Sequence, residues 1–345
     1  MEKRPEELLS VSIVIPTYNR ADLVGRAVAS AIAGCAAGDE VIVIDDGSTD
    51  QTAEALVLYR DRIRYVRTEN RGCGNARNEG VKRARNHLVA FLDSDDEWMP
   101  YTLGLQRAFM QARPDVLFCF SDFCTSYISG QVKRKHLISW HNDPRDWEEI
   151  LGAGFLFSSI APLPSGCEDF HVYVGDLSLP QMVTNYVFTS SLVVRREMAG
   201  EALRFAEDLR IHEDYACFCR LARKGPAAYM ECETAWQHGH GGPRISDADI
   251  MSRATNHITI LERVWGGDKD FLNQHGRHYQ KAVAAQRLIK ARELLSLRRT
   301  REARAELRLA GESPLSLRVL ALLPSPIMQG LMTMRSVFRR MLRRK

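Results

Sequence analysis

Short apolar runs alternate with stretches of helical periodicity along the first part of the chain. The apolar runs predict strands at residues 11–15, 41–44, 63–66 and 88–92. Between them, apolar residues at helical spacing predict helices over residues 22–32, 51–59 and 76–84, the first capped by Asp22. This order is typical of parallel strands joined by right-handed crossovers, so we expect an α/β fold.

The rest of the chain continues the sheet and then becomes helical. Further strands are predicted at residues 114–120, 186–195 and 227–232, and a helix at residues 211–223. Residues 121–185 mix aromatic residues with Pro and Gly, which favours irregular loops. From residue 250 the periodicity predicts helices, including 279–297 and 300–309, the latter with Ala303, Leu307 and Ala310 as an apolar stripe. We expect a domain at 1–248, a helical extension at 249–326 and a basic amphipathic tail at 327–345.

Three carboxylates follow the fourth apolar run: Asp93, Asp95 and Asp96. Open α/β sheets bind ligands at the ends of their strands, and an extended segment would place Asp93 and Asp95 on the same side. Two such carboxylates suit a hard cation, Mg²⁺ or Mn²⁺, which completes its shell with water and phosphate oxygens. The alternative is that Asp95 or Asp96 caps a helix starting near Met99, and both roles can hold together.

Other polar groups end the neighbouring strands. Tyr18 follows the first strand, and Asp45 and Asp46 follow the second. No GxGxxG motif follows the first strand, which disfavours a dinucleotide-binding fold, and no GxxxxGK[ST] loop is present for a nucleoside triphosphatase. These side chains should therefore meet at one edge of the sheet and bind another kind of nucleotide ligand.

Four motifs together resemble the family 2 glycosyltransferases. They are PTYNR at 16–20, IDDGSTD at 44–50, NRGCGNARNEG at 70–80 and FLDSDDEWMP at 91–100. The resemblance is close over residues 10–125 and looser over 185–245. It implies the GT-A nucleotide-diphospho-sugar transferase fold, a Rossmann-like and mostly parallel sheet flanked by helices, and transfer with inversion of configuration.

The resemblance also implies roles for individual residues. Pro16 and Tyr18 would line the nucleobase pocket, and Asp46 would accept a hydrogen bond from a uracil imide. Arg77 would face the diphosphate, Asp93 the ribose or the metal, and Asp95 would hold the metal. The implied nucleotide-sugar site comprises Pro16, Thr17, Tyr18, Arg20, Asp45, Asp46, Arg77, Asp93 and Ser94. The alternatives are simple packing for Tyr18 and a solvated helix charge for Arg77.

An acidic pair opens the helix predicted after residue 211. The helix macrodipole stabilises Glu213 and Asp214 in a first turn, which is a sufficient structural reason for them. The resemblance implies that Asp214 is the catalytic base and that Glu213 supports it. In the segment 236–246 the chain departs from the family pattern, with Gln237 where Arg is common. His240 is predicted to contact the donor phosphates or the metal, or else to be a loop histidine without such a role.

Composition places the chain among ordinary globular proteins. Of its 345 residues, 45% are apolar and 26% charged, and its net charge is +4. The start of the chain lacks a signal sequence and no run approaches the ~20 apolar residues of a spanning helix, so we expect a cytoplasmic protein. The eight cysteines lack zinc spacing and are expected to be reduced thiols.

The last segment of the sequence is strongly basic. Residues 328–345 contain six basic residues and no acidic ones, with Leu331, Met334, Phe338, Met341 and Leu342 on one helical face. The pattern predicts a helix lying on an anionic membrane surface, and the alternative is packing on the helical extension.

Together these features predict a glycosyltransferase that depends on Mg²⁺ or Mn²⁺. It would invert configuration while moving a sugar from a nucleotide donor, first of all a UDP-sugar, to a hydroxyl of a glycan or lipid-linked acceptor in cell-surface polysaccharide synthesis. No nucleic-acid partner is expected. The alternatives are a nucleotide-sugar-binding protein without catalysis and a sugar nucleotidyltransferase.

Overall fold

The computed structural model describes residues 8–142, 146–164, 167–242, 249–311 and 314–322. The chain divides into two compact units, Met1–Pro243 and Arg244–Lys345. Each unit is described by itself.

The first unit begins with four parallel strands. They are β1 (Val11–Thr17), β2 (Glu40–Asp45), β3 (Arg64–Arg67) and β4 (Leu88–Phe91). They are joined through α1 (Val24–Gly34), through α2 (Thr52–Ala55) with the turn η1 (Val57–Tyr59), and through α3 (Cys73–Arg83). β1 pairs with both β2 and β4, and β2 pairs with β3, all in parallel. The predicted strand–helix alternation and its parallel pairing are confirmed.

The remaining strands extend this sheet. They are β5 (Asp96–Trp98), β6 (Phe118–Ser126), β7 (Val132–Lys133), β8 (Phe155–Leu156), β9 (His171–Gly175), β10 (Val193–Arg195) and β11 (Ala227–His238). The order in the sheet is β3-β2-β1-β4-β10-β6-β11-β9-β8, with β5 pairing with β11 and β7 with β6. Most of the added pairs are antiparallel, but β11 runs parallel to β6. The sheet is therefore mixed: β1 to β4 pair only in parallel with one another, and β11 and β6 form a further parallel pair.

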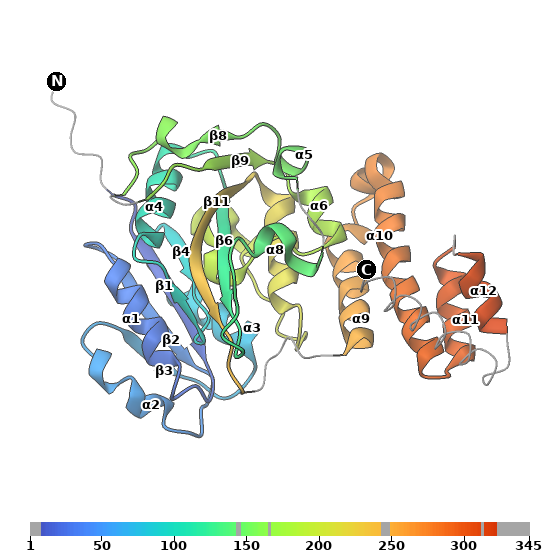
Figure 1. Cartoon of the computed structure of the whole chain (residues 1–345), viewed down its shortest axis with the longest axis horizontal. Coiled ribbons are helices and arrows are strands. Elements are labelled where there is room, and N and C mark those ends of the chain that lie inside the picture. Colours follow the sequence, from blue (N-terminus) through green and yellow to red (C-terminus); the bar gives the residue numbers. More distant parts are fainter. Residues whose placement is uncertain (1–7, 143–145, 165–166, 243–248, 312–313, 323–345) are drawn as a thin grey trace. The chain divides into compact units, whose positions relative to one another are not determined.

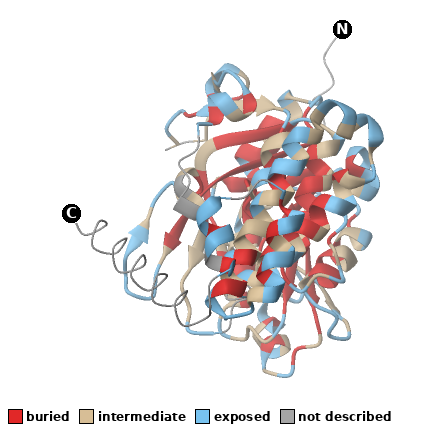
Figure 2. Cartoon of the chain, turned by 90° about the vertical axis from the view of Figure 1, so that its right-hand side faces the viewer, coloured by how far each residue is buried: buried red, intermediate tan, exposed pale blue. Residues whose placement is uncertain are grey.

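Helices cover both faces of the sheet (Figure 1). α1 and α4 (Thr102–Ala112) lie on one face, and α3 and α8 (Glu213–Lys224) lie on the other. Every residue of β1 and β4 is buried, and Figure 2 shows the sheet mostly in the colour of buried residues. Strands that are buried on both faces have continuous apolar sequences, which is why the apolar runs predicted these strands correctly.

α3 approaches β1 closely at one glycine. A Cβ atom built on Gly80 would lie 2.2 Å from Cγ1 of Val14. The absence of a side chain at Gly80 therefore sets how near α3 lies to the sheet.

Two helix starts differ from the sequence-based expectation. α1 has Leu23 at its N-cap and no side-chain cap, so the prediction that Asp22 caps it is wrong. The amide of Val24 bonds instead to the carbonyl of Arg20. α4 begins at Thr102 without a side-chain cap, so neither Asp95 nor Asp96 caps it. At both helix starts, backbone hydrogen bonds take the place of a side-chain cap. The presence of residue types that often cap helices was therefore not enough to predict the caps.

The region between β6 and α8 is more regular than expected, and one predicted strand is shorter. It contains α5 (Trp147–Leu151), β8, β9 and α6 (Ser178–Val183), with the turns η2 (Leu137–Asn142) and η3 (Phe157–Ser159). Within the strand predicted at 186–195, only β10 pairs as a strand, because Thr189–Ser191 form the turn η4. The short α7 (Arg196–Ala199) and the turn η5 (Gly200–Ala202) follow β10.

The second unit is helical where it is described. It contains α9 (Ile250–Leu261), the π-helical turn η7 (Glu262–Gly266), α10 (Lys269–Ser296), α11 (Thr300–Leu309) and α12 (Leu315–Leu322). Ala303 and Leu307 of the predicted stripe are buried against Leu294, Leu295 and Leu317, and Ala310, its third residue, is also buried. The helices predicted at 279–297 and 300–309 are confirmed, whereas the proposed tail at 327–345 lies outside the described residues.

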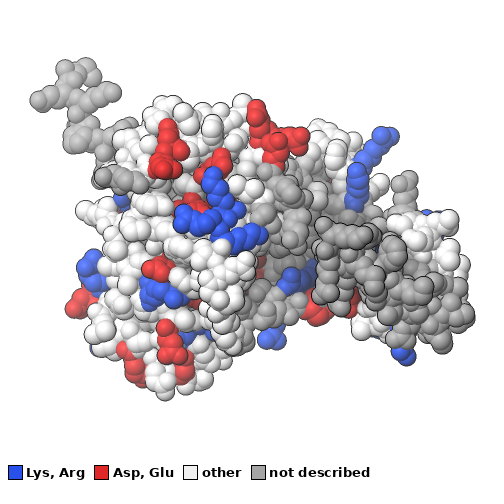
Figure 3. Space-filling view, viewed as in Figure 1, with Lys and Arg blue, Asp and Glu red and all other residues white. Residues whose placement is uncertain are grey.

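Charge is distributed without a dominant sign on the face of the first unit seen in Figure 3, where acidic and basic side chains lie next to each other. Over the part of the chain that the structure describes, no helix is both long and apolar enough to cross a membrane.

Candidate active site

The loops after β1 and β2 are held together by side-chain to backbone bonds. The Asn19 amide donates to Oγ of Ser48 (2.9 Å), and the Thr49 amide donates to Oδ1 of Asn19 (2.8 Å). The buried carboxylate of Asp45 accepts from the Ser48 amide (2.8 Å) and from the Tyr65 hydroxyl (2.5 Å). Asp45, predicted to bind the nucleotide, thus also holds the loop that follows it.

Asp46 joins the loop after β2 to the loop that precedes α3. Its Oδ1 accepts from the Arg71 amide (2.9 Å) and its Oδ2 from the Gly72 amide (2.8 Å). Burial raises the pKa of Asp46, although the two backbone bonds act in the opposite direction. An ionised carboxylate offers about four lone-pair sites, so these bonds leave acceptor capacity for a donor group on a ligand.

Tyr18 stands at the rim of this edge of the sheet. It is 43% exposed, whereas Pro16 and Thr17 are buried in β1. An exposed aromatic ring beside buried strand ends is suited to stack on a flat base. The predicted nucleobase role of Pro16, Thr17 and Tyr18 stays a prediction.

Arg77 on α3 is a buried cation between two carboxylates. Its Nη2 lies 2.7 Å from Oδ1 of Asp93, and its Nη1 lies 2.8 Å from Oε1 of Glu213. Its side chain is only 4% exposed and its guanidinium packs on the ring of Phe205, 5.2 Å from the centroid. Burial alone would lower the pKa of Arg77, but the acidic neighbours, Asp93 foremost, raise it well above its usual value. Arg77 is therefore a permanent charge that ties the loop after β4 to the start of α8, and its predicted contact with the diphosphate stays a prediction.

The acidic loop after β4 turns instead of continuing extended. The Asp96 amide bonds to the carbonyl of Asp93, Ser94 and Asp95 form the turn, and Asp96 begins β5. The expectation that an extended segment places Asp93 and Asp95 on the same side is therefore wrong, because the segment is a turn. Burial raises the pKa of Asp93, with Arg77 opposing this and Asp95 adding to it, so the two carboxylates still influence each other.

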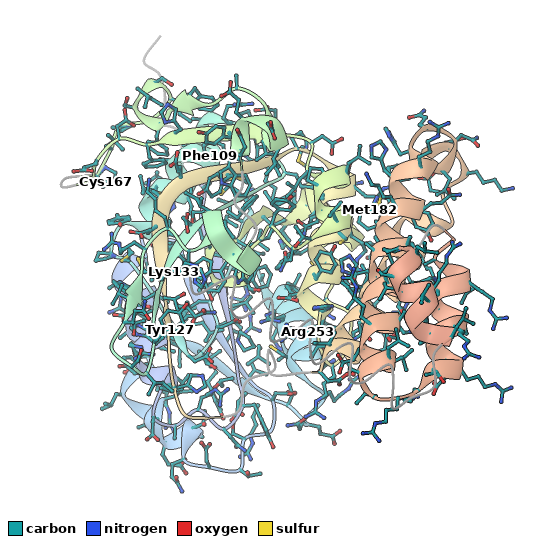
Figure 4. All side chains as sticks on the ribbon, turned by 45° about the vertical axis from the view of Figure 1, so that its right-hand side comes forward. Phe109, Tyr127, Lys133, Cys167, Met182 and Arg253 are labelled. Atoms are coloured by element: carbon teal, nitrogen blue, oxygen red, sulfur yellow. The ribbon has the colours of Figure 1, made fainter. Side chains whose placement is uncertain are left out.

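Asp95 meets a loop from the far end of the sequence. Its Oδ2 lies 2.9 Å from Nε2 of His240 and 3.9 Å from Nη2 of Arg20. β11 delivers His240, because it runs beside β6 towards the β6–β7 hairpin, on which Figure 4 labels Tyr127 and Lys133. The Gly239 amide bonds to the carbonyl of Ser126 in that hairpin.

The hydrogen bonds of His240 indicate its tautomer. The Gly242 amide donates to Nδ1 (3.2 Å), so a neutral ring carries its proton on Nε2 and donates it to Asp95. In this state His240 orients the Asp95 carboxylate. Whether it ligates a metal stays a prediction.

Glu213 and Asp214 lie in the first turn of α8, as predicted. Burial and the neighbouring Asp214 raise the pKa of Glu213 to about 7, although Arg77 opposes them. Asp214 accepts from the Tyr215 amide at Oδ1 (2.7 Å) and from the Thr189 hydroxyl at Oδ2 (3.2 Å). Asp214 also adds to the negative field at Asp93 and Arg77, so the acidic pair and the loop after β4 form one site.

The donor set fits a metal that shares its shell with a ligand. Among the described residues no three His, Cys, Asp or Glu side chains form a metal-binding group. Mg²⁺ and Mn²⁺ are commonly held by one or two carboxylates, with phosphate and water oxygens completing the shell. Asp95, whose side chain is 25% exposed, provides such a carboxylate.

Sequence reasoning missed a group of residues that support the site. Glu207 accepts from Asn75 (3.1 Å) and Asn78 (3.0 Å) on α3, and these bonds lower its pKa. The turn η4 contributes Thr189 and Ser190, which lie inside a segment that was predicted as a strand. Two adjacent serines and a threonine within an apolar run were the available signal.

Comparison with known proteins agrees with this geometry. The glycosyl transferase family 2 model matches residues 12–156. An uncharacterized glycosyltransferase of Rickettsia prowazekii is 41% identical over 259 residues, which cover 74% of this chain and 70% of the relative. The succinoglycan biosynthesis protein ExoO of Rhizobium meliloti is 30% identical over 234 residues, covering 65% of this chain and 61% of that protein. The match spans only 21% of two longer glycosyltransferases from Rickettsia felis and Rickettsia conorii.

Two solved structures share the fold. Residues 1–349 of S. aureus TarS in complex with UDP-GlcNAc superpose with a TM-score of 0.54 at 17% identity, covering 87% of this chain and 88% of that chain. The mannosyltransferase PcManGT of Pyrobaculum calidifontis in complex with GDP-Man and Mn²⁺ gives 0.52 at 18% identity, covering 90% and 77%. The motifs, the site and these matches agree: the chain belongs to glycosyltransferase family 2 and has the GT-A fold.

Proposed function

We propose that this transferase moves a sugar with inversion from a nucleoside diphosphate donor, in the first place a UDP-sugar, to a hydroxyl of a glycan or lipid-linked acceptor. Family membership and a relative in succinoglycan biosynthesis support a role in polysaccharide synthesis. UDP-GlcNAc and GDP-Man in the two related structures support a nucleotide-sugar donor.

One observation carries the proposal: Arg77 bridges the loop that ends in Asp95 and the helix turn that holds Asp214. A donor-binding carboxylate and a base must lie on opposite sides of the reacting sugar carbon in a single displacement. A rigid, buried ion pair between their two segments fixes that separation.

Asp214 would act as the general base. It takes the proton from the acceptor hydroxyl while that oxygen attacks the anomeric carbon, and the bond to the diphosphate breaks on the opposite face. The configuration inverts because only one displacement occurs. The bonds from Thr189 and the Tyr215 amide keep the carboxylate oriented and leave each oxygen a lone pair for the proton.

The donor would lie along the carboxyl ends of β1, β2 and β4. Tyr18 would stack on the base, and Asp46 would accept a hydrogen bond from it with the acceptor capacity that its two amide bonds leave. Asp93, Ser94 and Arg20 would flank the ribose and the phosphates.

Asp95, with Asp93 and His240 beside it, would hold Mg²⁺ or Mn²⁺. When bound, the ion supplies charge that neutralises the departing nucleoside diphosphate. The 2.9 Å contact between Asp95 and His240 holds these two side chains next to each other before any donor binds.

The test is a panel of nucleotide sugars assayed for release of the nucleoside diphosphate with Mn²⁺, combined with calorimetric binding of UDP. We expect Asp95→Ala to lose UDP binding in the presence of Mn²⁺. Asp214→Asn should bind UDP as the wild type does but lose turnover by about a hundredfold or more.

Two controls make the result interpretable. Asp115→Asn changes an exposed carboxylate that pairs with Arg113 and should alter neither quantity. Turnover of Asp214→Asn equal to that of the wild type would remove the base assignment, and a wild type that binds no UDP or GDP with Mn²⁺ would contradict the proposed donor.

A further inference from the structure

We propose that the turn η4 (Thr189–Ser191) fixes the position of the catalytic base relative to the donor-holding loop, residues 93–96. In it, Thr189 positions Asp214 and Ser190 positions residues 93–96. This inference rests on the proposed function, because it assigns supporting roles within the same site.

Thr189 reaches the base directly. Thr189 is only 4% exposed, and its hydroxyl donates to Oδ2 of Asp214 at 3.2 Å. The other oxygen, Oδ1, accepts from the Tyr215 amide in α8. The carboxylate is therefore held at one oxygen by its own helix and at the other by the turn. The bond from Thr189 thus determines how the carboxylate is rotated about its Cβ–Cγ bond.

Ser190 reaches the donor-holding loop at both of its ends. Its fully buried hydroxyl accepts from the Asp93 amide (3.1 Å) and donates to Oδ2 of Asp96 (2.5 Å). Its carbonyl accepts from Nε1 of Trp98 (2.6 Å). These bonds bracket the tight turn at Ser94 and Asp95, so Ser190 sets the direction in which Asp95 projects.

Ser191 provides a matched control within the same turn. It is 1% exposed, its hydroxyl donates to the carbonyl of Phe188 (2.9 Å), and it accepts from the Ser121 amide in β6 (3.2 Å). It has the same chemistry and burial as its neighbours, but its partners lie in the core. Loss of this hydroxyl should change stability without changing the site.

The arrangement explains why β10 begins only at Val193. Three extended residues would alternate their side chains between the two faces of the sheet, whereas one 3-10 turn brings the Thr189 and Ser190 hydroxyls to two parts of one site. Because the two hydroxyls lie on adjacent residues, the base and the loop cannot shift independently of each other.

The experiment compares Thr189→Val, Thr189→Ser, Ser190→Ala and Ser191→Ala in the full chain. Three quantities are measured: the melting temperature, the Kd for UDP with Mn²⁺, and kcat for release of UDP from the donor that the wild type uses fastest. For Thr189→Val we expect kcat to fall about tenfold with the Kd changed by less than about twofold. Thr189→Ser should restore kcat to within about threefold of the wild type, because it restores the donated bond.

For Ser190→Ala we expect the effect to fall on donor binding: the Kd for UDP with Mn²⁺ should rise about tenfold. If Ser190→Ala does not fold, Ser190→Thr keeps the hydroxyl and adds only a methyl group, and it should retain the wild-type Kd. Ser191→Ala should lower the melting temperature while kcat and Kd stay at wild-type values. The inference is overturned if Thr189→Val behaves like Ser191→Ala, or if Thr189→Ser is no better than Thr189→Val.

A crystal structure of Thr189→Val separates this inference from the proposed function. We expect the Asp214 carboxylate to be rotated while residues 93–96 keep their positions. If the Asp214 carboxylate does not move, the inference that Thr189 positions it is contradicted, even when the enzyme is active. A wild type without turnover would contradict only the proposed function.

Discussion

Arg77 shows how a single residue can determine both stability and site geometry. It satisfies two carboxylates on segments that lie more than a hundred residues apart, Asp93 and Glu213, from a position that is almost closed to water. Removing one partner of a buried ion pair is costly because the remaining charges lose their compensation.

Replacing Arg77 by Met should therefore lower the free energy of unfolding by about 3–5 kcal/mol, as measured by urea denaturation. The matched control is Arg71→Ala. Arg71 also pairs with a carboxylate, Glu207, but its side chain is 61% exposed, so the loss should stay below about 1 kcal/mol. Equal losses in the two variants would show that the Arg77 pair contributes no more than a surface contact.

Glu213 makes the stability depend on pH. Its pKa in the folded chain is raised to about 7, above the usual 4.5, so the folded state holds a proton that the unfolded state releases between these values. Stability should therefore fall as the pH rises from about 4.5 to about 7.

The change Glu213→Gln removes this titration and keeps an oxygen that can accept from Arg77. Between pH 5 and pH 8 the wild type should lose on the order of 1–3 kcal/mol of unfolding free energy relative to the variant. Urea denaturation at both pH values measures the difference. Parallel pH profiles for the two proteins would exclude Glu213 as the titrating group.

At the scale of elements, the packing of α3 on β1 depends on Gly80. A methyl group there would overlap Cγ1 of Val14, and neither the strand nor the helix can move without disturbing its neighbours. Gly80→Ala should lower the melting temperature and cost about 1–3 kcal/mol.

Gly104 in α4 is the matched control, because a Cβ there would meet nothing within 4 Å. Gly104→Ala should raise stability by about 0.5–1 kcal/mol through helix propensity. Adding Val14→Ala to Gly80→Ala should recover part of the loss. A Gly80→Ala variant as stable as the wild type would mean that α3 can shift freely.

Elements whose residues share one periodic environment were predictable from sequence. The strands β1, β2 and β4 are buried on both faces and read as apolar runs, and the helix α11 repeats apolar residues at helical spacing. By contrast, β5 is three residues long and exists because β11 pairs with it from more than a hundred residues away. No local pattern carries that information.

The site divides in the same way. Asp93, Asp95, Glu213 and Asp214 were found because carboxylates at strand and helix ends have a chemical reason to be there. The hydrogen bonds of Asp46 to the Arg71 and Gly72 amides depend on how two loops meet. Thr189 and Ser190 act only through residues distant in sequence, so the apolar run around them indicated a strand.

At the scale of the whole molecule, the second unit adds charge to the chain beyond the catalytic fold. Its described helices carry exposed arginines, among them Arg292, Arg301 and Arg308, and the residues 327–345 that follow contain six basic and no acidic side chains. Basic side chains near an anionic membrane contribute about 1 kcal/mol each.

We therefore predict that the full chain cosediments with vesicles containing phosphatidylserine, and that a chain ending at Pro326 does not. Vesicles of phosphatidylcholine alone should bind neither protein, and added salt should weaken the binding of the full chain. Cosedimentation unchanged by the truncation would rule out this role for residues 327–345.

β11 has a consequence for how the sequence can change. Its register with β6 is irregular between Met230 and Ala235, and from there regular pairing leads to His238, two residues before the imidazole that meets Asp95. Deleting one residue in that span would withdraw the imidazole by about 3.3 Å and exchange the faces to which Trp236 and Gln237 point. The number of residues between the irregularity and His240 thus determines where the imidazole lies. We expect natural variants to alter the residues of this span freely but to preserve their number.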